Sequence, residues 1–355
     1  MFNYFLRYTF RHLRARLNRA KQRGELSSVK VLRAVAVLFL FLVVFSGAPA
    51  ARLETREVTV AHEVEEAGEV AGTKRPFAAE ESVFPHRIPD SPEMEHLTAE
   101  AALVLDPESG RILYEKNPHE KLPPASTTKI MTALVSLENY SLSAVVSVPP
   151  ECLEGLSGKA QMGLFPGEKI SVEALLYGLL LNSASDAACA LAGYGRSQGE
   201  FVTLMNLEAR DLGLSQTHFN NPIGLDEEDH YSSAADLLLL VKEVMKNPEF
   251  RKIVGMQEVK VHDALSPPTR WHALKNTNVL LGAMTGITGV KTGRTEDARE
   301  CLIASWFYEG REIFAVLLGS EDRFTEMRSL FDWVKKVYSF GSSEVSSHSS
   351  ETAGR

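Results

Sequence analysis

Ser126 and Lys129 form the first candidate for a catalytic pair in the chain. A serine hydroxyl is a weak nucleophile until a neighbouring base takes its proton, and a lysine amine can be that base once it is neutral. Apolar residues recur at helical spacing from here to Val135, which predicts a helix beginning at Ser126. Residues three apart share a helix face, so the hydroxyl and the amine would meet on its first turn.

On this spacing alone, a structural interpretation stays open beside the catalytic one. Ser-x-x-Lys is a common combination, and Ser27 and Lys30 match it as well. A serine can cap a helix start, and a lysine one turn later can simply be solvated. The residues elsewhere in the chain have to decide.

Two later segments supply further polar groups. The stretch Leu180-Leu-Asn-Ser-Ala-Ser-Asp places Ser183 at a break between two predicted helices, where it could also cap the second. The stretch Gly289-Val-Lys-Thr-Gly-Arg-Thr places Lys291 on a predicted strand, and Gly293 removes a side chain where something approaches closely. Taken separately, each has an ordinary structural explanation.

Taken in order, these motifs resemble the three-part signature of active-site serine penicillin-recognising enzymes. The sequence is similar to the serine D-alanyl-D-alanine carboxypeptidases, the S11 peptidases, over roughly residues 98–338. The resemblance extends through Ala125-Ser-Thr-Thr-Lys-Ile-Met-Thr, which contains the candidate pair. Stretches without a candidate catalytic residue that share it are Gly167-Glu-Lys-Ile-Ser-Val, Phe219-Asn-Asn-Pro-Ile-Gly-Leu and Asn276-Thr-Asn. The resemblance implies an α/β (α+β) fold of the β-lactamase/transpeptidase-like type, an antiparallel sheet flanked by helices with an inserted helical lobe.

The resemblance also implies roles for individual residues. Ser126 would attack the D-Ala-D-Ala bond and become acylated, Lys129 would act as base, and Ser183 would relay a proton to the leaving D-Ala. The backbone N–H groups of Ser126 and Arg294 would form the oxyanion hole. The resemblance implies that Lys291 and Thr292 would hold the terminal carboxylate of the substrate. The other substrate-binding residues implied are Gly293, Arg294 and Ser185.

Ser185 departs from the pattern, because the family has Asn at this position. A hydroxyl offers fewer hydrogen bonds than an amide, so substrate positioning and turnover are in question. One alternative is therefore a penicillin-binding or wall-binding protein with impaired catalysis. Another is a class A-like β-lactamase, for which Glu227 or Glu228 would have to deacylate the enzyme. A third match, the nucleophile-elbow pattern Gly195-Arg-Ser-Gln-Gly, lacks a preceding strand and is interpreted as a turn.

The elements that position these groups alternate between strands and helices. Residues 101–105 and 111–114 predict a hairpin, and 145–148 a short strand. Helices are predicted at 171–181, 186–192, 200–212, 233–245 and 324–338, and strands at 287–292, 301–308 and 313–318. Strands at both ends predict one sheet, closed by the two termini of the domain.

The amino-acid composition divides the chain into four predicted segments. Residues 1–50 combine a basic start with the apolar run Ala34–Phe45 and an Ala48-x-Ala50 exit, which indicates a signal peptide or a retained membrane anchor. Residues 51–97 are expected to be an acidic spacer of low order, residues 98–340 the catalytic domain, and residues 341–355 a disordered tail. Either N-terminal alternative places the domain outside the cell membrane. Many S11 peptidases carry a further β-rich domain and an anchor at the C-terminus, and since few residues follow Gly293, any attachment is expected at the N-terminus.

Net charge and cysteine spacing argue against nucleic-acid binding and against a zinc site. The chain of 355 residues has a net charge of -8, and no basic patch for nucleic acid lies outside the N-terminus. Cys152, Cys189 and Cys301 are widely spaced and predict neither a zinc site nor a disulfide framework, only small buried side chains. No cofactor or metal is expected. The partners that the family resemblance implies are a peptidoglycan stem peptide ending in D-Ala-D-Ala and β-lactam antibiotics.

Overall fold

The computed structural model describes residues 84–155 and 157–340, which lie within one compact unit. The predicted signal or anchor, most of the predicted spacer and the predicted tail lie outside the described residues. Within the described ranges, no helix combines the length and the apolar character that a membrane span requires.

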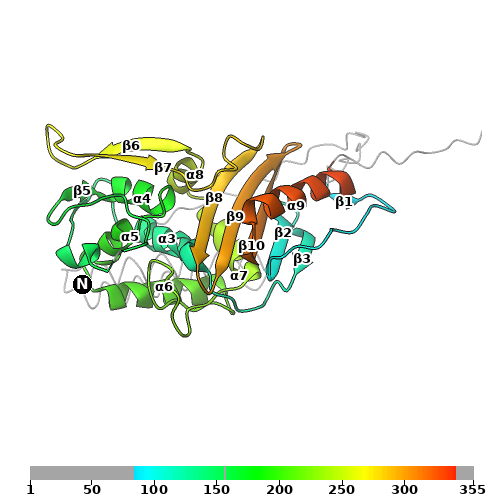
Figure 1. The fold of residues 1–355 in the computed structure, drawn as a ribbon, viewed down its shortest axis with the longest axis horizontal. Coiled ribbons are helices and arrows are strands. Elements are labelled where there is room, and N and C mark those ends of the chain that lie inside the picture. Colours follow the sequence, from blue (N-terminus) through cyan, green and yellow to red (C-terminus); the bar gives the residue numbers. More distant parts are fainter. Residues whose placement is uncertain (1–83, 156, 341–355) are drawn as a thin grey trace, which may run out of the picture. The chain divides into compact units, whose positions relative to one another are not determined.

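A five-stranded antiparallel sheet is built from both ends of the described chain (Figure 1). Its strand order is β3 (Arg111–Lys116), β2 (Ala101–Asp106), β10 (Arg311–Ser320), β9 (Arg299–Tyr308) and β8 (Ile287–Thr295). Strand β2 pairs with β10 over residues 101–105 and 314–318. The prediction of one sheet closed by the two ends of the domain is thereby confirmed.

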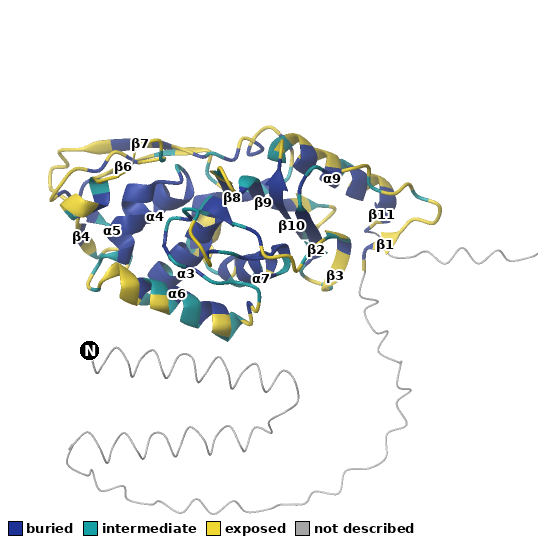
Figure 2. Cartoon of the chain, turned by 60° about the horizontal axis from the view of Figure 1, so that its bottom comes forward, coloured by how far each residue is buried: buried dark blue, intermediate teal, exposed yellow. Residues whose placement is uncertain are grey.

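Between β3 and β8 the chain forms a helical lobe. Its helices are α3 (Lys129–Asn139), α4 (Val172–Leu180), α5 (Ser185–Ala192), α6 (Gln198–Leu212), α7 (Ala234–Val244) and α8 (Pro248–Val254). Helices α4 and α5 are apolar on nearly every side, and they are buried almost throughout (Figure 2). Three small antiparallel pairs complete the described part: β1 (His86–Arg87) with β11 (Tyr338–Ser339), β4 (Val145–Ser147) with β5 (Lys169–Ser171), and β6 (Glu258–His262) with β7 (Trp271–Lys275).

The sheet separates two hydrophobic cores. Because side chains alternate along a strand, Leu103 and Ile303 pack into the core of the helical lobe, and Val104 and Leu302 pack into the other core. Helix α9 (Arg323–Val337) covers this second face and contacts β9 and β10. Strands β9 and β10 are thus held between two packed layers, and β8 is the edge strand, in contact with α8 and with residues 125–128.

The helix start at Ser126 differs from the prediction. Ser126 lies in a 3₁₀ turn, η1 (Ala125–Thr128), and the α-helix begins only at Lys129. Neither Ser126 nor Thr127 caps the helix, whose N-cap is Thr128. Sequence periodicity could not separate the two helix types, since the apolar pattern begins after the 3₁₀ turn. Ser183 is likewise not a cap, because the N-cap of α5 is Ala184.

The described domain begins before the predicted boundary at residue 98. Strand β1 pairs with β11, the Ile88 N–H donates to the carbonyl of Val337, and the Trp333 indole N–H donates to the carbonyl of Pro92 at 2.9 Å. The segment has weak periodicity because its partners are contributed by the distant C-terminal helix. Residues 84–97 are therefore not a spacer.

The cysteine prediction was wrong. Cys152 in η2 (Pro150–Leu153) forms a disulfide with Cys189 in α5, 37 positions away in the sequence. Cys301 is a free buried thiol, as expected. The pairing depends on how the helical lobe packs η2 against α5, which the spacing of the cysteines does not reveal.

Candidate active site

Ser126 and Lys129 are brought together as the sequence predicts. The Lys129 amine donates a hydrogen bond to the Ser126 hydroxyl at 2.9 Å and another to the carbonyl of Ile223 at 2.7 Å. The lysine is 1 % exposed, whereas the serine is partly exposed. Burial, with a further contribution from the charge of Lys159, lowers the pKa of Lys129 from 10.5 to about 7, and Asp186 opposes the shift. About half of the amine is therefore neutral at pH 7 and can accept a proton.

The Ile223 carbonyl is presented by a tight turn that the sequence highlighted only through the family resemblance. The Asn221 side-chain oxygen accepts the backbone N–H groups of Ile223, Gly224 and Leu225, at 3.2, 2.7 and 3.1 Å. Gly224 has φ of +81°, and a Cβ there would overlap the carbonyl group of Ala125. The turn thus packs directly against the backbone at Ala125 and Ser126.

Strand β8 closes the site on another side. A Cβ at Gly293 would come within 3.0 Å of the Ala125 Cβ and 3.1 Å of the Ser126 nitrogen, closer than side chains normally pack. The sequence prediction that a close approach requires Gly293 is consistent with this geometry. Thr292, Gly293 and Arg294 all line the cavity at Ser126.

Lys291 lies behind this surface. It is 1 % exposed, its amine donates to the carbonyl of Thr292 at 3.0 Å, and it is not among the residues that line the cavity. Burial and the charges of Lys129 and Arg323 hold the pKa of Lys291 well below its usual value. Its expected contact with a substrate carboxylate stays a prediction.

Ser183 lies in the turn between α4 and α5, Ser185 is the first residue of α5, and both line the cavity. Ser183 has φ of +58°, which is uncommon for a residue other than glycine and indicates a position fixed by its surroundings. The Ser185 N–H donates to the carbonyl of Ala160 at 2.8 Å. Among the hydrogen bonds of the described residues, none joins the Ser183 hydroxyl to Ser126 or Lys129.

Arg323 is a site residue that the sequence prediction missed. It begins α9, its guanidinium Nη1 donates to the carbonyl of Gly293 at 2.7 Å, and its Nε is buried without a hydrogen-bond partner. Its side chain also lines the cavity. No local sequence motif identifies Arg323 as a site residue. It lies 30 positions after Gly293 and comes close to β8 only because β9 and β10 fold back beside that strand.

The cavity has a volume of about 390 Å³ and a positive lining. Its lining residues are Ser126, Lys129, Gly158, Lys159, Ala160, Ser183, Ser185, Ile223, Gly224, Leu225, Thr277, Thr292, Gly293, Arg294, Thr295 and Arg323. Four of them carry a basic side chain and none an acidic one. A nucleophile, a neighbouring base and this charge suit attack on a carbonyl next to a carboxylate.

Two alternatives lose support at this point. Neither Glu227 nor Glu228 lines the cavity, and Glu227 accepts a hydrogen bond from the Asn221 amide at 3.0 Å. Ser197 is the N-cap of α6 and forms a capping box with Glu200, so it is not a nucleophile elbow.

Comparisons with known proteins agree with the geometry. Residues 88–322 match the family described as D-alanyl-D-alanine carboxypeptidase, peptidase S11. The D-alanyl-D-alanine carboxypeptidase DacF of Bacillus subtilis is 36% identical over 247 residues, which cover 68% of this chain and 63% of the relative. DacC of Escherichia coli is 33% identical over 270 residues, covering 72% and 64%. The chain thus spans slightly under two thirds of the length of these two relatives.

A structural relative completes the comparison. The crystal structure of the Streptomyces K15 DD-transpeptidase aligns with a TM-score of 0.65 and 30% identity, covering 69% of this chain and 99% of that one. The fold is therefore that of the penicillin-binding DD-transpeptidases, as the resemblance implied. Together with the Ser126–Lys129 pair, these matches show that the chain belongs to the peptidase S11 family of D-alanyl-D-alanine carboxypeptidases.

Proposed function

We propose that the chain is a serine-type D-Ala-D-Ala carboxypeptidase that removes the terminal D-Ala from peptidoglycan stem peptides. The observation that carries the proposal is the contact between the Ser126 hydroxyl and the buried Lys129 amine at 2.9 Å. Ser126 attacks the carbonyl carbon of the D-Ala-D-Ala bond while neutral Lys129 takes the hydroxyl proton. An acyl-enzyme forms, and the terminal D-Ala leaves as an amine after it accepts a proton.

Ser183 is the proposed relay for that proton, because it lines the cavity from the turn before α5. Water then attacks the acyl-enzyme, the Ser126–acyl bond breaks, and the serine recovers its proton. The backbone N–H groups of Ser126 and Arg294 are the proposed oxyanion hole, where each donor is worth about 3 kcal/mol in other hydrolases. β-Lactams would acylate Ser126 in the same way.

Preference for a chain end requires a site for the terminal carboxylate. Arg323 suits this role because its guanidinium is fixed by the Gly293 carbonyl and its side chain lines the cavity. Thr292 lines the same cavity, and Lys291 on β8 stays the predicted partner of the terminal carboxylate. Ser185, which replaces the family's Asn, is the residue expected to limit turnover.

The proposed reaction places the domain on the outer side of the cell membrane, where stem peptides occur. The Cys152–Cys189 disulfide fits an oxidising compartment. Attachment through the apolar run at residues 34–45, or export after its cleavage, stays a prediction.

The proposal is tested by measuring released D-Ala. The full chain should release D-Ala from a peptide ending in D-Ala-D-Ala and not from the same peptide ending in D-Ala-L-Ala. Ser126→Ala should abolish release, while Ser197→Ala, which alters an exposed serine at the N-cap of α6, should retain it. Penicillin acylation without any D-Ala release would instead support the catalytically impaired alternative.

A further inference from the structure

One wall of the cavity is a loop that carries an additional cation. This wall loop, residues 157–168, contributes Gly158, Lys159 and Ala160 to the lining. Lys159 is partly exposed, and among the described residues no carboxylate forms an ion pair with it. Its charge nevertheless reaches the catalytic centre, since it helps to lower the pKa of Lys129.

The wall loop is anchored to α5 by backbone hydrogen bonds. The Asp186 carboxylate accepts the N–H groups of Met162, Gly163 and Leu164 at 3.0, 3.0 and 3.2 Å. The carbonyl of Ala160 accepts the Ser185 N–H. The Asp186 carboxylate thereby fixes the loop, and among the ion pairs of the described residues none joins it to Lys159.

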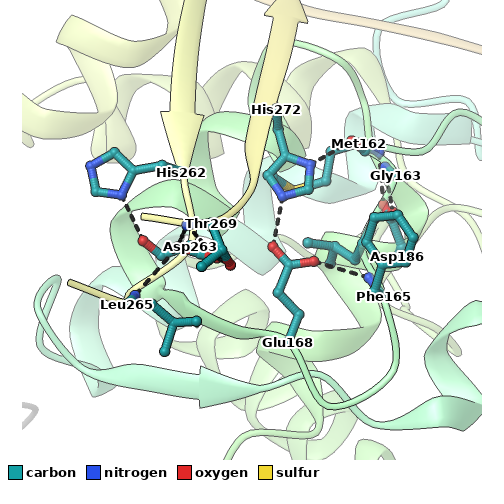
Figure 3. Close-up of polar contacts among 11 residues, drawn as sticks. Met162, Gly163, Phe165, Glu168, Asp186, His262, Asp263, Leu265, Thr269 and His272 are labelled. Atoms are coloured by element: carbon teal, nitrogen blue, oxygen red, sulfur yellow. Dashed lines mark hydrogen bonds and ion pairs between the residues drawn. The ribbon is translucent and has the colours of Figure 1, made fainter. Parts of the chain in front are cut away.

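A second set of contacts anchors the loop to the β6–β7 hairpin (Figure 3). Buried His272 on β7 lies with Nδ1 3.1 Å from the carbonyl of Met162 and Nε2 2.7 Å from the carboxylate of Glu168. The other Glu168 oxygen accepts the Phe165 N–H at 3.0 Å. The Cys152–Cys189 disulfide also joins η2, which precedes the loop, to α5. Contacts with α5 and with β7 thus fix the backbone of the wall loop, and Lys159 extends from a loop of defined position.

The charges of the cavity exceed what one carboxylate would balance. Lys129, Lys159, Arg294 and Arg323 line it, and none of the lining residues is acidic. Glu300, outside the lining, lies 3.9 Å from the Arg323 guanidinium. In the proposed reaction Lys129 works in its neutral form, and Arg323 takes the terminal carboxylate. Lys159 is built on the helical lobe rather than on β8, so it is a separate binding position.

We propose that Lys159 binds a second carboxylate of the peptide substrate, carried by the residue that precedes the D-Ala-D-Ala unit. The inference rests on the proposed function and adds a substrate class, peptides with an acidic side chain next to the scissile unit. A charge-assisted hydrogen bond in this cavity should favour such a peptide about tenfold over its uncharged amide.

The test is a competition against acylation of the full chain by a fluorescent penicillin. Two peptides of equal length end in D-Ala-D-Ala and differ only in a carboxylate or a carboxamide on the preceding side chain. The wild type should require about tenfold less of the carboxylate peptide for half inhibition of labelling. Because both peptides are compared on the same variant, changes in Ser126 reactivity cancel in this ratio.

Variants identify the residue responsible. Lys159→Gln should bring the ratio close to one, and Lys159→Arg should preserve it. Lys260→Gln, an exposed lysine on β6 outside the cavity lining, is the matched control and should keep the wild-type ratio. High salt should reduce the ratio in the wild type, which tests the charge effect without any substitution.

Two results would overturn the inference. A wild-type ratio near one, or a Lys159→Gln ratio equal to that of the wild type, would show that Lys159 is only a solvated cation. These outcomes leave penicillin labelling intact and so contradict this inference alone. Absence of labelling at Ser126 in every variant would contradict the proposed function as well.

Discussion

A change of pH across neutrality should switch the reactivity of Ser126. Lys129 can accept the serine proton only as a neutral amine, and burial lowers its pKa from 10.5 to about 7. At pH 7 about half of Lys129 is neutral, compared with about 0.03 % of an ordinary lysine. The buried environment thus raises the population of active base roughly a thousandfold, which corresponds to about 5 kcal/mol.

The assay is the second-order rate constant of acylation by a fluorescent penicillin between about pH 5.5 and 9.5. We expect the rate constant to rise about tenfold per pH unit below pH 6, to reach half its maximum near pH 7 and to level off above pH 8. Lys159→Gln should move the midpoint to higher pH, because Lys159 helps to lower the pKa of Lys129. Lys129→Arg, which stays charged, should lose at least about a hundredfold in rate.

The control is the same pH series on the fold itself, followed by circular dichroism. A rate constant that does not change from pH 5.5 to 9.5, while the fold is intact, would refute the role of Lys129 as base. A midpoint near pH 10 would show that the lysine is not buried in its working state.

Three further predictions concern residues that support or line the cavity at Ser126. Replacing Cys152 and Cys189 by Ala opens a link between residues 37 positions apart, and should lower the free energy of unfolding by about 4 kcal/mol in urea titrations; an unchanged midpoint would contradict this. Gly293→Ala places a Cβ 3.1 Å from the Ser126 nitrogen, and should slow penicillin acylation about tenfold while melting stays cooperative; a wild-type rate would show that the contact is not needed. Ser185→Asn should keep the fold and should still be labelled by fluorescent penicillin, since its side chain borders the cavity; loss of labelling would argue against the assigned position.

The sequence predicts best where a signal is local. The runs that became β9 and β10 have the length and composition of buried strands, and a tight turn connects them. Helices α4 and α7 were expected within a residue or two of their observed bounds, because each starts at a serine that caps it. The three-residue spacing of Ser126 and Lys129 suggested the candidate catalytic pair, but only the order of the later motifs, and the family resemblance they carry, favoured it over a capped helix.

The remaining features depend on contacts between distant segments. The Cys152–Cys189 disulfide requires the packing of η2 on α5, and Arg323 reaches Gly293 only through the order of the strands. The β6–β7 hairpin and α8 are short, so their periodicity is too weak to identify. The buried position of Lys291 could not be inferred, since a strand lysine is usually solvated at its tip.

The most direct test of the central claim is to locate the acyl group on the chain. The wild type and Ser126→Ala are incubated with penicillin, digested with a protease, and the modified peptide is identified by mass spectrometry. We predict one penicilloyl adduct, on the peptide that contains Ser126, and none in the variant. An adduct on another serine such as Ser183, or an adduct that persists in Ser126→Ala, would contradict the proposal that Ser126 is the nucleophile.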